Sequence, residues 1–206
     1  MTAMPTAYDP RRGAAVVAAA LAEWKKGVRE PPEGDPAPIR EYLRVCGFSH
    51  PESYKANGDK QWCGAFAGFC LVSSGVRPEV VEVKDIPEVG DLASTYRLWH
   101  LANSMPGCLI TQASDLRPGD IAIVGRAGKY RFGEHIVVVG SKPTPFDEDS
   151  TFDTVEGNAT GAGVGGLRYE GVVKRTRPVM PSSDVKGFIS GFRPHSGLYI
   201  SEMHHG

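Results

Sequence analysis

The chain has 206 residues, of which 41% are hydrophobic and 23% are charged, a composition typical of a globular protein with a substantial core. Its formal net charge of −1 argues against nucleic acid as the main partner, because such binding needs many cations on one face. No apolar run approaches the roughly 20 residues of a membrane-spanning helix, so we expect no membrane span.

Signals for a helix open the chain. Asp9 followed by Pro10 is a typical N-cap and first helical residue, and Gly27 is a typical end, so the sequence predicts an Ala-rich first helix between them. Two arginines precede the apolar stretch 14–22, which leaves a cleaved secretory signal as the alternative. We favour the helix, and we expect synthesis in the cytoplasm without an evident signal peptide.

Further helices are expected in the first half of the chain. The four prolines of 30–38 predict an extended connector. Apolar spacing then predicts a short helix over 39–46 and a strongly apolar one over 62–74, and Ser94 is a plausible N-cap for a helix to about residue 103.

The second half changes to short β-rich runs bounded by Gly, Pro, Asp or Ser: 121–124, 136–139, 152–155, 167–173 and 188–192. Helices first and strands afterwards predict an α+β fold with helices packed on one face of a central antiparallel sheet. We expect one domain over 1–206, with a core of about 14–193 and less ordered tails. The glycine-rich stretch 157–166 is expected to be a flexible loop beside a cleft.

The four cysteines contain no CxxC pair, and the histidines show no metal-ligand spacing. We therefore expect reduced thiols, no metal and no cofactor. The cysteines are Cys46, Cys63, Cys70 and Cys108.

Cys63 is the candidate nucleophile. If a helix begins near Trp62, the thiol lies in its first turn, where unpaired amides and the helix dipole favour an anion. A nearby histidine lowers such a thiol pKa further. The alternative is a core cysteine, because Cys63 shares one helical face with Phe66 and Cys70.

His135 opens a predicted strand, and Glu156 and Asn158 end the next one. Symmetric pairing across the loop 141–150 sets 140 against 151 and therefore His135 against Glu156, with Asn158 diagonal on the same face. Either can accept a hydrogen bond from the imidazole and fix its tautomer. Thiol, base and orienting group are the parts of a nucleophilic site, with the amide of Cys63 and, more weakly, the side chain of Gln61 as oxyanion donors.

These motifs resemble the CHAP family of cysteine, histidine-dependent amidohydrolases/peptidases, within the NlpC-like, papain-type group. The resemblance extends from about residue 14 to 193. Two departures are Glu134, where related sequences often have glycine, and the stretch 77–106, whose Trp99 and His100 are candidates for the rim of the site. The matching motifs are Trp62-Cys63-Gly64-Ala65-Phe66, Leu116-Arg117-Pro118-Gly119-Asp120-Ile121, Glu134-His135-Ile136-Val137 and Val155-Glu156-Gly157-Asn158.

The resemblance implies a papain-like fold, Cys63 as nucleophile, His135 as base, and Glu156 and Asn158 as imidazole-orienting positions. It implies peptidoglycan as the substrate, cut at the muramoyl-L-Ala bond or within the stem and cross-bridge peptides. With no wall-binding module evident, we expect a phage lysin or an exported antibacterial toxin that acts in the periplasm or at the wall. A toxin would have an immunity protein as partner.

Other interpretations stay open. The same residues serve a cysteine acyltransferase or a protein deamidase, and an inert Cys63 would leave a binding module without catalysis. Four cations of the last strands are expected to form a solvated strand face, with attraction of an anionic glycan as the alternative: Arg168, Lys174, Arg175 and Arg177.

Overall fold

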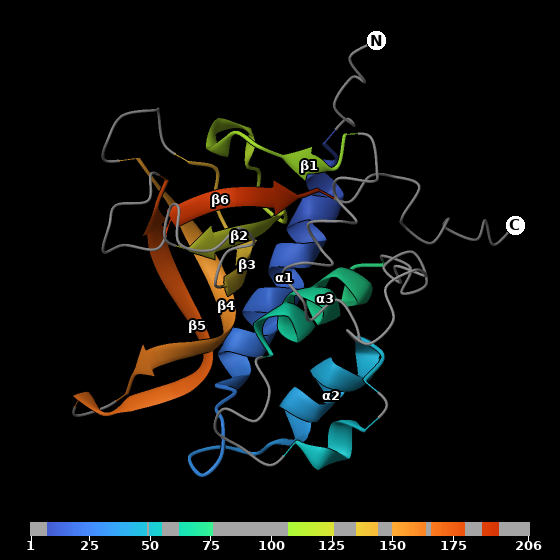
Figure 1. Cartoon of the computed structure of the whole chain (residues 1–206), viewed down its shortest axis with the longest axis vertical. Helices are drawn as coiled ribbons and strands as arrows, with labels where there is room; N and C mark the ends of the chain where they lie inside the picture. The colour runs from blue at the N-terminus through green and yellow to red at the C-terminus, as the bar shows by residue number, and fades with distance from the viewer. Residues whose placement is uncertain are drawn as a thin grey trace, which may run out of the picture.

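The computed structural model describes residues 8–48, 50–54, 62–75, 107–125, 135–143, 150–163, 166–179 and 187–193. Within these residues the chain forms three α-helices and a six-stranded sheet in which all recorded pairings are antiparallel (Figure 1). The predicted α+β class is confirmed. The helix predicted from Ser94 lies outside the described residues.

The first helix, α1 (Pro10–Lys26), follows the predicted signals. Asp9 is its N-cap and accepts a hydrogen bond from the backbone N–H of Arg11, with Pro10 at the first helical position. At the other end Gly27 adopts a φ of 68°, a conformation that costs glycine little, and its N–H donates to the carbonyl of Trp24. Val16 on its inner face is fully buried, so α1 is part of the core.

Together with α1, the other two helices form a layer on one face of the sheet. The helix α2 (Ala37–Val45) begins two residues earlier than predicted, and α3 (Cys63–Ser73) begins within a residue of its predicted start. Because α3 is apolar on all sides, it needs cover all round, and it packs against α1, α2, β3 and β4. None of the described helices has the length and apolar character needed to span a membrane.

The sheet has the order β1-β6-β2-β3-β4-β5. The longest strands, β4 and β5, form a hairpin that curves away from the rest of the sheet (Figure 1, orange). Because β4 continues to Ala162, the prediction of a flexible loop over 157–166 is wrong for its first six residues. The strands are β1 (Leu109–Ile110), β2 (Ile121–Gly125), β3 (His135–Val139), β4 (Thr151–Ala162), β5 (Arg168–Pro178) and β6 (Gly187–Phe192).

The two faces of the sheet bury different sets of side chains. Ile136 and Val138 of β3 face the helices and join one buried cluster with α1, α2 and α3. Val137 and Val139 face the other way, into a second cluster that contains Phe152 of β4. Among the described residues the helices lie on one face, and the second cluster is closed by strand, loop and short 3-10 segments.

The register of β3 and β4 differs from the predicted one. Val138 pairs with Val155 and Val139 with Thr154, so Gly140 lies opposite residue 153 instead of 151. The predicted pairing would set buried Val138 against Asp153, whereas the observed pairing sets two buried valines together. A shift of two residues preserves which residues share a face, because side chains alternate with a period of two.

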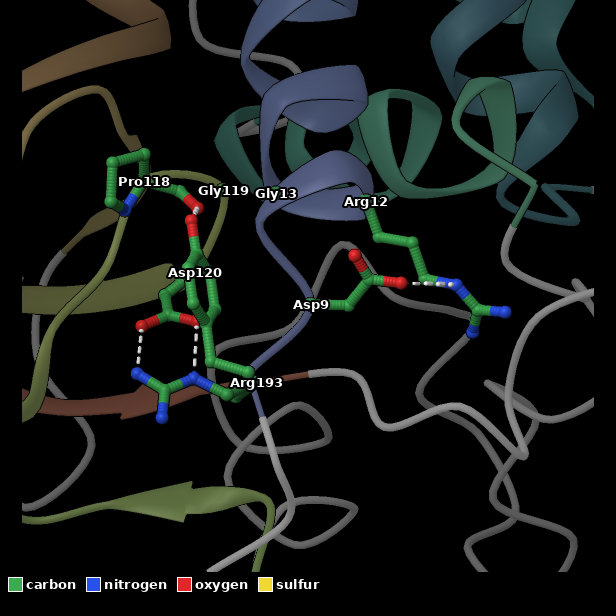
Figure 2. Close-up of a pocket in the computed structure, with 8 residues that line it drawn as sticks. Asp9, Arg12, Gly13, Pro118, Gly119, Asp120 and Arg193 are labelled. Carbon is green, nitrogen blue, oxygen red and sulfur yellow. Dashed lines mark hydrogen bonds and ion pairs between the residues drawn. The ribbon is translucent and has the colours of Figure 1, made fainter.

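A small pocket lies where the first turn of α1 meets the segment leading into β2 (Figure 2). Inside it Arg193 makes a bidentate ion pair with Asp120, at 2.9 and 2.6 Å, and the hydroxyl of Tyr8 donates to the carbonyl of Pro118. A Cβ at Gly13 would lie 2.3 Å from that carbonyl oxygen. With a volume of about 10 Å³ the pocket holds no more than about one water, so this corner joins helix to sheet.

Candidate active site

Cys63 is the first residue of α3, where helix amides have no helical acceptor. The first helical hydrogen bond runs from the N–H of Phe66 to the carbonyl of Trp62 at 2.9 Å. The N–H groups of Cys63, Gly64 and Ala65 therefore have no acceptor within the helix, and amides in this position favour an anion. The N–H groups of Gly64 and Ile136 hydrogen-bond the Cys63 sulfur, and the residue is only 4% exposed.

His135, the first residue of β3, hydrogen-bonds the Cys63 thiol with its side chain. Its Nε2 lies 3.2 Å from Oε2 of Glu156. Because Nε2 is engaged by the carboxylate, Nδ1 is the ring nitrogen left to face the sulfur. The structure thus brings the side chains of Cys63 and His135 together, as the sequence predicted.

The thiol and the imidazole approach each other from different faces of the sheet. Cys63 belongs to the cluster of Ile136 and Val138, whereas His135 is in phase with Val137 on the opposite face. They can meet because the pairs recorded between β3 and β4 involve only Val138 and Val139, at the other end of β3. The start of α3 thus reaches the edge of β3 at His135.

Glu156 is fully buried and forms the centre of a charged network. Its two oxygens accept hydrogen bonds from Nε and Nη2 of Arg177, each at 2.6 Å, in a bidentate pair. The hydroxyl of Thr154 donates to Oε1 at 2.5 Å. A buried carboxylate with this many donors is held in the ionised form and in one orientation, and so fixes the imidazole that it contacts.

The electrostatics favour a thiolate–imidazolium pair. Burial alone would raise the pKa of Cys63, but the hydrogen bond and charge of His135 and the amides of Ile136 and Gly64 lower it below its ordinary value of 9.0. Burial also opposes the imidazolium, yet Cys63 and Glu156 raise the pKa of His135 to about 9. The pKa of Glu156 is lowered far below 4.5: burial opposes this, but His135 and Arg177 prevail.

Asn158 hydrogen-bonds other partners than the imidazole predicted for it. Its Oδ1 accepts a hydrogen bond from the backbone N–H of Trp62 at 3.0 Å, and its Nδ2 donates to Oε1 of Glu30 at 3.2 Å. Its φ of 55° coincides with a shift in the β4–β5 register between Glu156 and Ala159. Simple alternation therefore fails at Asn158, and of the two proposed orienting residues it is Glu156 that contacts His135.

The same network continues to the connector before α2. Glu30 is 3% exposed, and its Oε1 also accepts a hydrogen bond from the indole N–H of Trp62. The side chain of Trp62 is fully buried. Glu30 and Asn158 together hold both the backbone and the ring of the residue that precedes Cys63.

Gly157 allows β4 to pass directly against the start of α3. A Cβ at this position would lie 2.5 Å from Cβ of Phe66 and 2.7 Å from Cζ3 of Trp62. Real Cβ atoms essentially never come so close, so only glycine fits between Glu156 and Asn158. This contact sets the distance between the carboxylate network and the thiol.

Some predicted residues lie outside the described part of the chain, and some contributors were not predicted. Gln61, the weak oxyanion candidate, is outside it, as are Glu134, Trp99 and His100. The solvated face predicted for the cations of β5 is wrong for Arg177, which is 7% exposed. The sequence carried a signal for the burial of Arg177, because a carboxylate such as Glu156 on a buried strand requires a neighbouring cation. Nothing in the sequence pattern pointed to Glu30.

No group of three or more His, Cys, Asp and Glu side chains in the described ranges is arranged to hold a metal ion. All four cysteines are in described segments, and none of them forms a disulfide bond. Comparison of the chain with protein-family models, with curated proteins and with solved structures found no match in any of the three.

Proposed function

We propose that the protein is a cysteine amidohydrolase, with Cys63 as nucleophile and His135 as general base and acid. One observation carries the proposal: the thiol at the start of α3 hydrogen-bonds an imidazole that a buried carboxylate holds. Burial raises the pKa of an ordinary core cysteine, as it does at Cys70. The lowered pKa of Cys63 and its two amide contacts favour a reactive thiolate instead.

In the proposed reaction the thiolate attacks the amide carbon, and a C–S bond forms as the carbonyl oxygen becomes an oxyanion. The N–H groups at the start of α3 are suited to stabilise that oxyanion. Collapse breaks the C–N bond, and the imidazolium of His135 gives its proton to the leaving nitrogen. Water, deprotonated by the now neutral imidazole, then hydrolyses the thioester, which releases the acid and regenerates the pair.

Peptidoglycan is the proposed substrate, on the motif resemblance of residues 62–66, 116–121, 134–137 and 155–158. The proposal extends to a phage lysin or an exported toxin with an immunity protein that covers Cys63. It predicts lysis of cells in which the protein is directed to the periplasm, and survival with Cys63→Ala. Absence of lysis in the first case would contradict the wall-degrading role.

The direct test is digestion of defined muropeptides, with released fragments identified by mass. We expect Cys63→Ala to lower turnover at least about a thousandfold while leaving the circular dichroism spectrum unchanged. Cys70→Ala, seven residues along the same helix, is the matched control and should retain turnover. Hydrolysis that survives Cys63→Ala would overturn the mechanism. Transfer of the acyl group to an amine, or release of ammonia from a protein, would favour an acyltransferase or a deamidase.

A further inference from the structure

A polar pocket adjoins the proposed active site at His135. It has a volume of about 180 Å³, compared with about 150 Å³ for a cavity that holds benzene. Cys63 is not among its lining residues, whereas the imidazole is. The described residues that line it include His135, Asn158, Thr160, Glu170, Arg175 and Arg177.

The charges in this pocket differ in how far they are already paired. Arg177 is committed to Glu156 in the bidentate ion pair. Glu170 accepts a hydrogen bond from the hydroxyl of Thr160. Arg175 donates from Nη2 to the carbonyl of Thr160, but its Nε is 3.9 Å from the Glu156 carboxylate and its side chain is 37% exposed. Arg175 is therefore the cation best placed to meet an incoming anion.

The position of the pocket tells which half of a substrate would enter it. In the proposed mechanism the imidazolium delivers its proton to the leaving nitrogen, so the leaving amine lies beside His135. The acyl half stays on the sulfur of Cys63. Because the pocket is lined by His135 and not by Cys63, it is nearer to the leaving half than to the acyl half.

We propose that this pocket binds a carboxylate carried by the leaving-amine half of the substrate, with Arg175 as the cation that receives it. The inference rests on the proposed hydrolase function for the assignment of the leaving half. Binding of the carboxylate itself rests only on the pocket. Arg175 can form two parallel hydrogen bonds with a carboxylate, whereas an amide offers a single neutral acceptor.

Binding is tested on the full-length Cys63→Ala protein by calorimetric titration, which needs no turnover. The probes are a stem tetrapeptide with free carboxylates and the same peptide with every carboxylate amidated. We expect the carboxylate form to bind about tenfold more tightly or better, and Arg175→Gln to abolish that difference. Lys174→Gln removes a charge from the same strand on its other face, where Lys174 lies over Trp24, and should preserve it.

Equal binding of the two peptides, or a preference that Arg175→Gln leaves intact, would overturn the pocket assignment. Glu170→Gln removes the negative charge from the pocket and should therefore strengthen carboxylate binding. Weaker binding by this variant would contradict the pocket assignment.

Kinetics on the active protein then separate this inference from the proposed function. With substrates that carry a carboxylate or an amide on the leaving side, Arg175→Gln should raise KM about tenfold for the first only, with little change in kcat. Turnover of neither substrate by the unmodified protein contradicts the hydrolase function, while the titration still decides the pocket. Turnover of both, with a calorimetric preference but no kinetic one, contradicts the placement of the carboxylate on the leaving side.

Discussion

Asn158 on β4 accepts a hydrogen bond from the backbone N–H of Trp62 at 3.0 Å, across 96 positions of the chain. Trp62 immediately precedes Cys63, so this bond fixes the point at which α3 begins. Glu30 completes the arrangement through the indole N–H of Trp62 and the amide of Asn158. The position of the thiol therefore depends on residues that do not touch it.

Glu30→Ala should disturb the thiol without contacting it. The change leaves two donors, the buried indole N–H of Trp62 and the part-buried amide of Asn158, without this acceptor, which costs about 2–5 kcal/mol of unfolding free energy. We also expect slower alkylation of Cys63 by iodoacetamide in the folded protein. Urea denaturation and mass analysis of the labelled thiol measure both effects. Glu33→Ala, at an exposed site in the same connector, is the control, and equal results for the two variants would contradict the role of Glu30.

Glu156→Gln tests the partner of the imidazole. The amide cannot stabilise the imidazolium as a carboxylate does, so kcat should fall about a hundredfold or more. The pKa of His135 should fall below its present value of about 9, since Glu156 contributes to raising it. Titration of the ring by NMR separates this effect from mere loss of structure. An unchanged pKa would show that Glu156 does not support the charged ring.

The same carboxylate predicts how stability responds to acid. The folded-state pKa of Glu156 lies below its ordinary value of 4.5, so the folded protein resists taking up a proton that the unfolded chain accepts. This stabilisation is complete above about pH 4.5 and is lost as the pH falls further. Denaturation at several pH values should show a steeper loss below 4.5 for the natural protein than for Glu156→Gln. Parallel curves would contradict the prediction.

The proposed catalytic pair, Cys63 and His135, predicts a bell-shaped dependence of kcat/KM on pH. Activity should rise as the pH passes the lowered pKa of Cys63, because the thiolate forms there. It should fall as the pH passes about 9, because His135 then loses the proton that the leaving nitrogen needs. Rates measured across this range on a muropeptide check both limbs. A basic limb near 6.5, the ordinary value for histidine, would mean that the ion pair does not form.

Gly157→Ala should move β4, which carries Glu156, away from the start of α3, which carries Cys63. The added methyl group would overlap Phe66 and Trp62, so β4 must move away from α3. We expect a loss of about 1–3 kcal/mol and a larger proportional loss of kcat than of binding. Gly140→Ala, whose new Cβ would be no closer than 3.4 Å to a neighbour, is the matched control. Similar behaviour of the two variants would contradict the role given to Gly157.

Local signals in the sequence were sufficient for the helices. The caps at Asp9 and Gly27 bound α1 as predicted, because a cap depends on the few residues beside it. The meeting of Cys63 with His135 was also predictable, since the motifs combine a helix start with a strand start. The register between β3 and β4 was not, because the burial of Val138 against Val155 outweighs symmetric closure of the loop.

Long-range partners were the harder part of the site. Arg177 was expected in solvent, although it shares the face of Phe152 and Glu156 in the β4–β5 register and is buried with them. Asn158 departs from strand alternation through its positive φ, which the sequence did not signal. Glu30 reaches Asn158 across 128 positions of the chain. Such a contact depends on the completed fold and leaves no periodic trace.

The bonds from Glu30 to Trp62 and Asn158, and from Glu156 to His135 and Arg177, join the connector before α2 to the end of β5. No shorter fragment of the polypeptide can therefore assemble this constellation, and truncation at either end of that span should abolish catalysis outright. Recovery of hydrolysis after dilution from denaturant would then report the last long-range step of refolding, later than any signal from the helices alone.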